Sequence, residues 1–267
     1  MERTYVLGTH DEEIERLGLQ HRVWRPRVSL AWRKAGFTVG QTILDAGCGP
    51  GYATSDLAEI VGPTGRVWAL ERSRRFLDAL DALHGPLANV ERVELDLDVA
   101  PFPEMQADGA WVRWVLCFVR RPREVLHKIA QCVKPGGTIV IHEYFDYRSW
   151  RMAPACAALD EFVEAVMASW RGAGGEPDIA LELPAWLTEE GFRIDETLPI
   201  IEVTRVGTYL HEWPRAFVRT GVENLVKLGH VSPERAPAMQ REILARLDDP
   251  GTIVFTPAVL EIRATRA

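Results

Sequence analysis

Short apolar runs alternate with longer amphipathic stretches between residues 40 and 143. The short runs are rich in β-branched residues and mostly end at a small or acidic residue, as the buried strands of a parallel sheet do. Repeated strand–helix units of this kind predict a parallel sheet with helices on both faces. The strands expected from these runs are residues 42–46, 66–71, 90–95, 109–118 and 138–143. The helices expected between them are residues 52–61, 73–83 and 123–132.

Helical spacing also marks both flanks of this region. Residues 11–30 predict one or two amphipathic helices that begin at an aspartate cap and form a lid. The C-terminal part predicts helices at residues 153–170, 183–190 and 209–247, a break at Ser232-Pro233, a sixth strand at 192–203 and a final strand at 258–265. The whole pattern predicts an α/β fold with a doubly wound, mostly parallel seven-stranded sheet, a helical N-terminal lid and a helical cap insertion.

Composition and charge narrow the class of protein. The chain has 267 residues, of which 47% are hydrophobic and 26% are charged, as expected for a globular protein with a packed core. Its cysteines show no CxxC spacing, and no apolar run resembles a leader or a membrane span, so a cytoplasmic protein is expected. A net charge of −7 argues against a nucleic acid partner, although a local basic patch at Arg72, Arg74 and Arg75 stays open. The cysteines are Cys48, Cys117, Cys132 and Cys156.

The clearest local motif is ILDAGCGPG at residues 43–51, in which a strand runs into a glycine-rich turn ahead of the helix expected from Tyr52. Gly47 and Gly49 let the backbone approach a ligand closely, and N–H groups at the start of the helix favour a carboxylate or a phosphate. A tight strand–helix turn without any ligand is the alternative.

Acidic residues follow this turn at the ends of the next two strands. Glu71 lies about 20 residues beyond the glycines, where a carboxylate can accept hydrogen bonds from both hydroxyls of a ribose. Asp96 can accept from an adenine amino group while Leu97 packs on the ring, and Asp98 competes for the same role. Each acid could instead serve the fold alone, Glu71 at a helix start and the aspartates in a surface loop.

The glycines occur as Gly-x-Gly-x-Gly, with Tyr52 where the Gly-x-Gly-x-x-Gly of dinucleotide-binding proteins has its third glycine. In order and at typical spacing, DAGCGPG, VWALERS, VELDLD, DGAWVRWVLCFV and KPGGTIVIHEY resemble the class I S-adenosylmethionine-dependent methyltransferases over residues 40–145. The flanking YVLGTHDEEIERLGLQHRVW and FTPAVLEIRATR look like those of a bacterial small-molecule subgroup. The resemblance implies S-adenosylmethionine as cofactor, S-adenosylhomocysteine as product and a Rossmann-like fold.

The resemblance also implies the roles of single residues. Gly47 and Gly49 face the methionine moiety, and Arg113 lies near the cofactor beneath the fourth strand, unless it pairs with an acid such as Asp108. In the lid, Tyr5 and Gln20 close over the methionine end or pack on their own helices. The cofactor-binding residues expected in this way are Tyr5, Gln20, Asp45, Gly47, Gly49, Glu71, Arg72, Asp96, Leu97 and Arg113. One methyltransferase domain is expected over residues 1–267, with a lid (1–38), a cofactor-binding core (39–146), a cap with the sixth strand (147–250) and the final strand (251–267).

Methyl transfer requires a nucleophile aligned with the sulfonium methyl group and shielded from water. A general base helps if the acceptor is a hydroxyl or a protonated amine. The candidates are Glu143 and His142 at the end of the fifth strand, with His211 of the cap behind them. Glu143 and His142 could instead have structural roles. His142 would then lie in a helix interface, and Glu143 would hydrogen-bond to the backbone or to the cofactor's amino group.

The acceptor is expected to be a small, hydrophobic or aromatic metabolite, because the cap is rich in aromatic residues. No acid cluster for a metal and no Asn-Pro-Pro-Tyr motif occurs, so O- or N-methylation is expected and C-methylation stays open. A non-catalytic S-adenosylmethionine-binding protein is the alternative, whereas an NAD-dependent oxidoreductase would need a Tyr-x-x-x-Lys pair that the sequence lacks. No membrane partner is expected, and the oligomeric state, including a homodimer, stays open. The aromatic residues expected around the acceptor are Trp150, Trp170, Trp186, Trp213 and Phe217.

Overall fold

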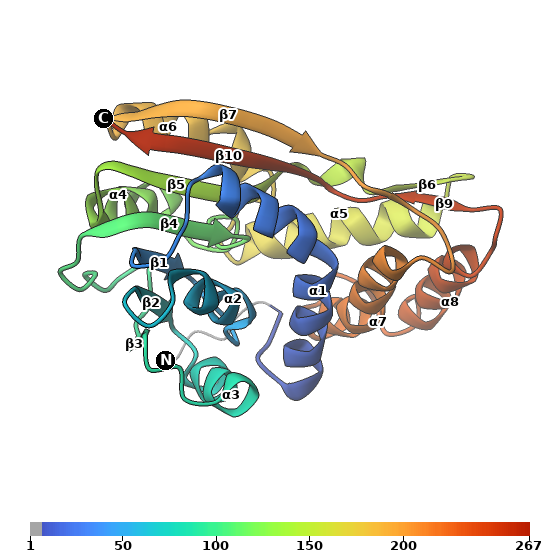
Figure 1. The fold of residues 1–267 in the computed structure, drawn as a ribbon. Helices are drawn as coiled ribbons and strands as arrows, with labels where there is room; N and C mark the ends of the chain where they lie inside the picture. The colour runs from blue at the N-terminus through green and yellow to red at the C-terminus, as the bar shows by residue number, and fades with distance from the viewer. Residues whose placement is uncertain (1–6) are drawn as a thin grey trace.

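The computed structural model describes residues 7–267, whose main sheet has the strand order β3-β2-β1-β4-β5-β10-β7. Strands β1 to β5 run parallel, and β10 pairs antiparallel with both β5 and β7 (Figure 1). The predicted seven-stranded, mostly parallel sheet is therefore confirmed. The strands are β1 (Thr42–Ala46), β2 (Arg66–Glu71), β3 (Val90–Glu94), β4 (Ala107–Arg113), β5 (Val133–Asp146), β7 (Phe192–Ile200) and β10 (Ala258–Arg266).

Two strands have other boundaries than the apolar pattern predicts. β4 ends at Arg113 rather than at residue 118, because Trp114 has a left-handed backbone (φ 50°) that turns the chain out of the sheet. β5 begins early, since Val133 already pairs with Ala107 before the KPGG segment bulges out ahead of residue 138. The apolar run after β4 is thus a buried turn, and that turn reaches the site described below.

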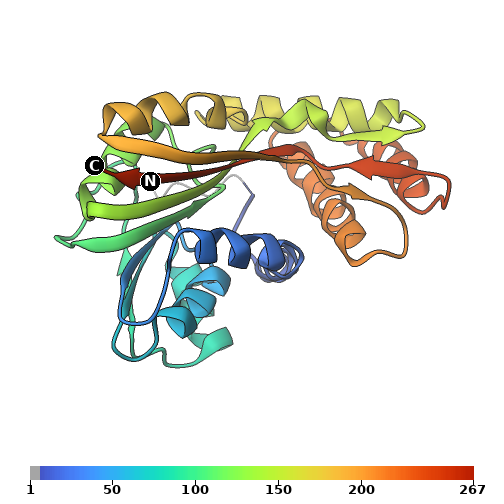
Figure 2. The ribbon, with the colours of Figure 1, turned by 45° about the horizontal axis from the view of Figure 1, so that its top comes forward.

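Helices cover both faces of the sheet, with α1 and α2 on one side and α4 and α6 on the other (Figure 2). Of the predicted one or two N-terminal helices, the structure has one, α1, and its N-cap is His10 rather than Asp11. The Nδ1 atom of His10 accepts a hydrogen bond from the backbone N–H of Glu13 at 3.2 Å. The helices are α1 (Asp11–Lys34), α2 (Tyr52–Val61), α3 (Arg74–His84), α4 (Pro122–Cys132), α5 (Ala157–Gly172), α6 (Leu183–Glu189), α7 (Glu212–Lys227) and α8 (Ala236–Leu247).

Close packing fixes α1 on the sheet and on α2. The rings of Trp32 and Trp111 meet edge to face at 5.3 Å between centroids, which anchors the C-terminal half of the helix on β4. Gly18 allows the N-terminal half to approach α2, because a Cβ atom there would lie 2.7 Å from the Tyr52 hydroxyl. The predicted lid is therefore a packed helix with extensive contacts to the core.

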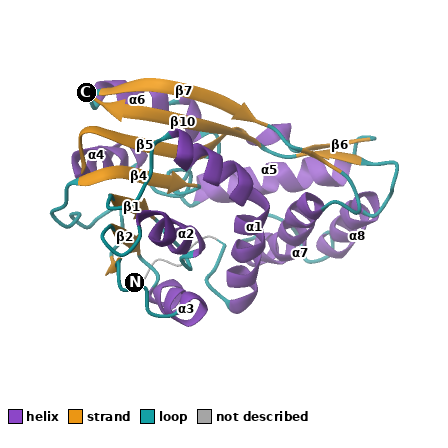
Figure 3. Ribbon diagram, in the orientation of Figure 1, coloured by secondary structure: helices purple, strands orange, loops and turns teal. Residues whose placement is uncertain are grey.

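Beyond the end of the sheet, α5, α7 and α8 gather beside a second, three-stranded sheet of order β6-β9-β8 (Figure 3). Its strands have two or three residues each, too few for a hydrophobic period, so the sequence pattern does not predict them. They are β6 (Arg151–Ala153), β8 (Val203–Thr204) and β9 (Ile253–Phe255), and short 3₁₀ turns occur at Tyr147–Ser149, Ile179–Leu181 and Tyr209–His211. Within residues 7–267, none of the helices has the length and apolar character needed to cross a membrane.

Candidate active site

A large cavity opens at the carboxyl ends of strands β1 to β5, where open α/β sheets bind their ligands. It contains about 1380 Å³ of space between atoms, part of it open to solvent. Strand ends form one wall, and α1, α5 and α7 form the other. The cavity therefore lies between the carboxyl edge of the sheet and the helices that cover this edge.

The cavity brings together the predicted cofactor residues that the structure describes. Residues of α1 and of the ends of β1, β2, β3 and β4 meet there, although they lie up to 93 positions apart in the chain (113 minus 20). Tyr5 lies outside the described residues. Binding of S-adenosylmethionine by these residues stays a prediction. The residues brought together are Gln20, Asp45, Gly47, Gly49, Glu71, Arg72, Asp96, Leu97 and Arg113.

The glycine turn after β1 leaves room for a ligand on one side and packs against a neighbouring turn on the other. A Cβ atom on Gly49 (φ 56°) would meet nothing within 4 Å, and this residue lines the cavity. A Cβ atom on Gly47 (φ 71°) would lie 2.6 Å from a methyl carbon of Val115, in the turn after β4. Gly47 thus permits contact between the two turns, and Gly49 permits a ligand to approach the backbone.

Two backbone donors fix the carboxylate of Glu71. Its Oε2 atom accepts from the N–H of Gly49 at 3.0 Å, and its Oε1 atom accepts from the N–H of Ser73 at 2.8 Å. Burial raises the pKa of Glu71, and these two hydrogen bonds oppose that rise. Each carboxylate oxygen keeps a further lone pair that can accept from a ribose hydroxyl. The geometry therefore fits the ribose of an adenosyl cofactor.

The two competing aspartates after β3 occupy different surroundings. Asp96 lines the cavity together with Leu97, whereas Asp98 is buried outside it. The carboxylate of Asp98 accepts hydrogen bonds from the backbone N–H groups of Arg120 and Arg121, both at 3.0 Å. Asp98 therefore stabilises the loop before α4, whereas Asp96 lines the cavity, and its contact with an adenine amino group stays a prediction.

Asp45 lies at the floor of the cavity beneath the glycine turn. Its Oδ2 atom accepts a hydrogen bond from the hydroxyl of Thr54 at 2.7 Å. Burial raises the pKa of Asp45 to about 6, although the Thr54 hydrogen bond and the nearby Arg113 lower it. This carboxylate can therefore change its charge near neutral pH, beside the place expected for the methionine moiety.

The guanidinium of Arg113 packs on aromatic side chains and does not pair with the acid suggested above. Its guanidinium carbon lies 5.3 Å from the ring centroid of Trp114, and its Nη2 atom lies 3.2 Å from Nδ1 of His21. The suggested partner Asp108 instead pairs with Lys134. Burial lowers the pKa of Arg113 to about 10, which leaves it charged at neutral pH. Arg113 thus contributes a positive charge to the cavity.

Glu143 does not line the cavity. It is fully buried, and its Oε1 atom accepts hydrogen bonds from the backbone N–H groups of Val115 and Leu116, both at 2.7 Å. These bonds hold the turn that follows the left-handed residue Trp114. The structure therefore shows the backbone-bonding alternative, and this position gives no support to Glu143 as a general base.

The histidine candidates are also buried away from the cavity. The Nε2 atom of His142 on β5 lies 2.8 Å from a carboxylate oxygen of Glu261 on β10, its cross-strand partner. The Nε2 atom of His211 lies 2.9 Å from the carbonyl oxygen of Leu247. A base must come within hydrogen-bond reach of the proton that it removes. Neither histidine does so in this arrangement, and His142 lies in a strand pair rather than in the helix interface considered above.

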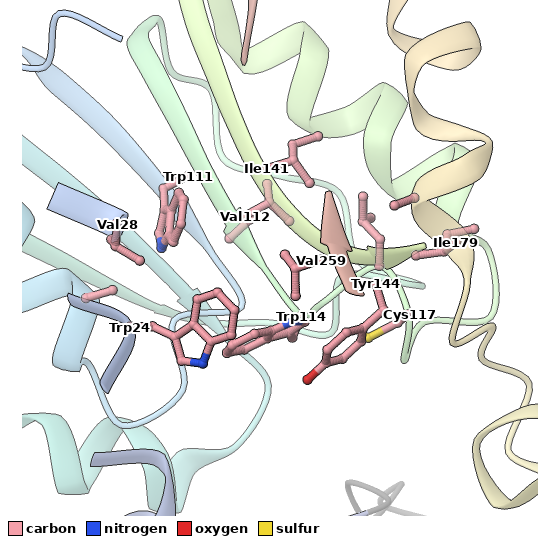
Figure 4. Packing of buried hydrophobic residues seen from close by; sticks show 14 of the residues in the cluster. Trp24, Val28, Trp111, Val112, Trp114, Cys117, Ile141, Tyr144, Ile179 and Val259 are labelled. Atoms are coloured by element: carbon pink, nitrogen blue, oxygen red, sulfur yellow. The ribbon is translucent and has the colours of Figure 1, made fainter. Parts of the chain in front are cut away.

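Aromatic rings line the part of the cavity away from the glycine turn. Of the five aromatic residues expected there, only Trp186 lies elsewhere, in a surface groove beside α4. The ring of Trp114 stacks on Tyr144 at 5.4 Å between centroids and on Trp213 at 5.8 Å. Figure 4 shows Trp114 and Tyr144 side by side, with the Tyr144 hydroxyl pointing away from the sheet. The aromatic lining consists of Trp114, Phe118, Tyr144, Tyr147, Trp150, Trp170, Trp213 and Phe217.

Arg16 on α1 also lines the cavity, although the sequence analysis does not single it out. Its Nε and Nη2 atoms each lie 2.7 Å from a carboxylate oxygen of Glu13, and Nη1 donates to Gln20 at 3.0 Å. The guanidinium carbon lies 5.4 Å from the ring centroid of Phe217. The signal in the sequence is the spacing of three and four residues, which places these polar residues on one face of an amphipathic helix.

Comparisons with known proteins show similarity to methyltransferases over part of the chain. Residues 44–141 match the family model described as a methyltransferase domain. The biotin biosynthesis bifunctional protein BioHC of Teredinibacter turnerae is 30% identical over 54% of this chain and 28% of its own length. The ubiquinone/menaquinone biosynthesis C-methyltransferase UbiE of Pseudomonas fluorescens is 30% identical over 48% of this chain and 50% of its own. The chain thus spans half or less of the length of these curated relatives.

The fold agrees with this result. A solved structure of geranyl diphosphate methyltransferase with GPP and sinefungin superposes with a TM-score of 0.56, at 13% identity, over 92% of this chain and 80% of that chain. The resemblance to class I S-adenosylmethionine-dependent methyltransferases found in the sequence is therefore confirmed over residues 44–141, and the Rossmann-like fold is confirmed by the solved structure.

Proposed function

We propose that this chain, acting as a single domain in the cytoplasm, transfers a methyl group from S-adenosylmethionine to a small aromatic acceptor. The observation that carries the proposal is one cavity with a chemically divided lining. Its carboxylates all lie at the strand ends beside the glycine turn, and its aromatic rings lie towards the cap. Such a division suits a polar cofactor next to a planar, apolar acceptor. The carboxylates are Asp45, Glu71 and Asp96.

The residues at the glycine turn fit S-adenosylmethionine. Glu71 offers two oriented oxygens to a ribose, and Asp96 with Leu97 offers an acceptor and an apolar surface to an adenine. Gly49 leaves the backbone accessible to the methionine moiety. When bound, the cofactor supplies an electrophilic methyl group on a sulfonium.

The aromatic lining supports an acceptor with a flat ring. Trp114, Tyr144 and Trp213 stack with interplanar angles of 18°, so further planar groups can pack against them. The UbiE relative is named for quinone biosynthesis and for transfer to carbon. A ring carbon is therefore a candidate for the methylated atom, in addition to oxygen and nitrogen. The negative net charge supports a small molecule rather than a nucleic acid as the partner.

The chain's own contribution to the reaction is positioning and exclusion of water. Within residues 7–267, no histidine or lysine lines the cavity. The carboxylates that line it are all at its cofactor end. The acceptor therefore binds with its nucleophilic atom already deprotonated, or loses its proton to solvent. Stacked rings hold the acceptor's plane, and α1 and α7 cover the cavity from outside the sheet.

The first test is calorimetric titration of the purified protein with S-adenosylhomocysteine and with NAD. We expect micromolar binding of S-adenosylhomocysteine and none of NAD, and Glu71→Ala should weaken the binding by the loss of ribose hydrogen bonds worth about 1–3 kcal/mol each. Transfer of a labelled methyl group to a panel of naphthols and naphthylamines then tests catalysis. Cofactor binding without transfer to any aromatic acceptor would favour the non-catalytic alternative, and binding of NAD alone would refute the proposal.

A further inference from the structure

A buried histidine of α1, His21, links α2 to the arginine at the end of β4. It is 4% exposed and does not line the cavity. Its Nε2 atom lies 3.0 Å from Oδ2 of Asp56 on α2, and its Nδ1 atom lies 3.2 Å from Nη2 of Arg113. A carboxylate can only accept hydrogen bonds, and a guanidinium can only donate them. These contacts therefore assign the proton of the neutral ring to Nε2 and leave Nδ1 as the acceptor for Arg113.

The surroundings of Asp56 and His21 maintain this arrangement of protons. Arg25, one turn after His21 on α1, donates to both carboxylate oxygens of Asp56, at 2.7 Å and 3.0 Å. Burial raises the pKa of Asp56, but the hydrogen bonds from His21 and Arg25 outweigh this effect and lower the pKa. Burial lowers the pKa of His21, despite the hydrogen bond to Asp56, so the ring is neutral at neutral pH. A neutral His21 beside an ionised Asp56 keeps Nδ1 as an acceptor.

Arg113 keeps donors for a bound molecule. Among residues 7–267 it forms no ion pair, His21 is its hydrogen-bond acceptor, and its Nη1 atom is buried without a partner. The ring centroids of Trp111 and Trp114 lie 5.7 Å and 5.3 Å from its guanidinium carbon, so these rings restrict the side chain without neutralising its charge. Because buried polar groups are normally hydrogen-bonded, an arginine that lines a cavity in this state is suited to bind an anionic group.

The sheet places Arg113 beside the glycine turn. Ala46 and Val112 pair with each other on the neighbouring strands β1 and β4. The residues that follow them, Gly47 and Arg113, therefore lie next to each other at the carboxyl edge of the sheet, and both line the cavity. The resemblance places the methionine moiety of the cofactor at this turn. Of the two charged groups of that moiety, the carboxylate matches a guanidinium, whereas the amino group is repelled by it.

We infer that His21 is a positioning residue that holds the guanidinium of Arg113 for the carboxylate of the cofactor's methionine moiety. This inference rests on the proposed function and extends its cofactor site to a residue that does not line the cavity. The hydrogen bond from Nη2 to Nδ1 fixes one edge of the planar guanidinium, so the remaining N–H groups keep a defined direction. Without this acceptor the arginine keeps its charge but must be ordered by the ligand, which weakens binding.

The test compares two ligands that differ in the carboxylate alone. S-adenosylhomocysteine carries it, whereas the decarboxylated analogue, S-adenosyl-3-thiopropylamine, keeps the adenosine, the thioether and the amino group. In calorimetry on the full chain, wild type should bind S-adenosylhomocysteine at least roughly tenfold more tightly than the analogue, which corresponds to about 1.4 kcal/mol. Arg113→Met should reduce this preference to roughly twofold or less, because it removes the charged donor. Absence of the preference in wild type, or an unchanged preference in Arg113→Met, overturns the inference.

Two substitutions of His21 separate its two hydrogen bonds. The side-chain oxygen of asparagine can occupy the place of Nδ1, whereas the longer side chain of glutamine places its polar atoms near Nε2. His21→Asn should therefore keep the acceptor for Arg113 and a preference within roughly twofold of wild type. His21→Gln keeps a partner for Asp56 but loses the acceptor for Arg113, so it should lower the preference by roughly threefold to tenfold, the range for one hydrogen bond.

The preference for the carboxylate distinguishes positioning from a purely structural role. Both variants lose the ring that stacks on Tyr52 at 6.1 Å between centroids, so both should lose stability in urea unfolding. A structural role alone would weaken binding of the two ligands equally and leave the preference unchanged. An unchanged preference in His21→Gln, or a larger loss in His21→Asn than in His21→Gln, therefore refutes the positioning role. The double variant His21→Gln/Arg113→Met should show the same preference as Arg113→Met, because His21 acts through the arginine.

A measurement on unaltered His21 covers the case in which neither variant of this residue folds. In protein labelled with ¹⁵N-histidine, NMR should show a neutral ring protonated at Nε2, whose Nδ1 signal shifts in Arg113→Met because its donor is lost. No ring with this response would refute the hydrogen bond and the inference with it.

The outcomes for this inference and for the proposed function are distinct. Failure of wild-type protein to bind S-adenosylhomocysteine would refute the proposed function. Normal binding, with the preference lost in Arg113→Met but unchanged in His21→Gln, would refute only the positioning role of His21.

Discussion

The Oε1 atom of Glu143 lies 2.7 Å from the backbone nitrogen of Val115, and the side chain of Val115 in turn packs against Gly47. A carboxylate buried in β5 thus fixes the turn after β4, which contacts the glycine turn after β1. The same turn begins at Trp114, whose φ of 50° is costly for a residue with a side chain. Glu143 is therefore placed to orient both a cofactor contact and an aromatic wall.

Replacing Glu143 should affect binding through this turn. Glu143→Leu leaves the N–H groups of Val115 and Leu116 without an acceptor, so we expect a loss of about 1–3 kcal/mol of stability per group. The turn should also relax away from Gly47 and weaken binding of S-adenosylhomocysteine. Glu143→Gln keeps an amide oxygen for the two donors and should retain cofactor affinity. Chemical unfolding and calorimetry measure the two effects, and equal affinity in both variants would contradict the positioning role.

The charge of Glu143 predicts a pH-dependent difference in stability. Burial raises its pKa from 4.5 to about 7, so its favourable contribution is fully present below pH 4.5 and is lost as the pH rises through about 7. Glu143→Gln cannot titrate at this position. The free energy of unfolding of wild type should therefore fall relative to that of Glu143→Gln, by up to about 3 kcal/mol, between about pH 5 and pH 8. Unfolding in urea at both pH values measures this difference, and a constant difference would show that Glu143 has an ordinary pKa.

Gly49→Ala should weaken cofactor binding in addition to straining the backbone. Both Gly49 (φ 56°) and Gly36 (φ 78°) have a positive φ, and a Cβ atom on either would meet nothing within 4 Å. Alanine at each position should therefore lower the free energy of unfolding by a similar amount, roughly 1–2 kcal/mol. Only Gly49 lines the cavity, so only Gly49→Ala should weaken S-adenosylhomocysteine binding, by roughly tenfold or more. Equal affinities of the two variants in calorimetry would place the cofactor elsewhere.

The sequence predicts the sheet and the cofactor end well because both rest on local patterns. Strands β1 and β2 have the predicted boundaries, since each apolar run ends in a residue that also ends the strand. Gly47 and Asp96 follow β1 and β3, Glu71 is the last residue of β2, and the carboxyl ends of parallel strands meet at one edge. Strand order therefore brings these residues together without any knowledge of their side-chain contacts.

The acceptor end depends on contacts that no local pattern encodes. Glu143 and Tyr144 are adjacent on β5, yet alternation along the strand turns one into the core and the other into the cavity. β5 pairs with β4 on one side and, on the other, with β10, which lies 115 residues later in the chain (258 minus 143). Arg16 is brought to Phe217 by the packing of α1 on α7. Of the two base candidates on this strand, Glu143 therefore faces away from the cavity, whereas His142 lies two residues before Tyr144, outside the cavity lining, and is buried against Glu261.

Asp96 and Asp98 should respond to alanine in opposite ways. Asp96 lines the cavity, so Asp96→Ala should weaken S-adenosylhomocysteine binding by roughly twofold to tenfold. Its loss of stability should be smaller than that of Asp98→Ala, because the Asp96 carboxylate accepts one backbone hydrogen bond, from the N–H of Asp98. Asp98 accepts from the backbone of Arg120 and Arg121, so Asp98→Ala should lower the free energy of unfolding by about 1–3 kcal/mol at unchanged affinity. Calorimetry and urea unfolding on both proteins check this pair. The reverse pattern would make Asp98 the adenine-binding residue.

Asp45 should make cofactor binding depend on pH. Burial raises its pKa to about 6, so the carboxylate is largely ionised at about pH 7.5 and largely protonated at about pH 5. The resemblance places the methionine moiety, with its positive amino group, at the glycine turn above this residue, and an ionised acid attracts that group more strongly than a neutral one. We therefore expect S-adenosylhomocysteine to bind roughly tenfold more weakly at the lower pH. Asp45→Asn, which has the same shape and no charge to lose, should bind weakly with a flatter pH profile. Because Glu71 is unchanged in that variant, a pH profile as steep as that of wild type would assign the titration to another group and leave Asp45 with a structural role through Thr54.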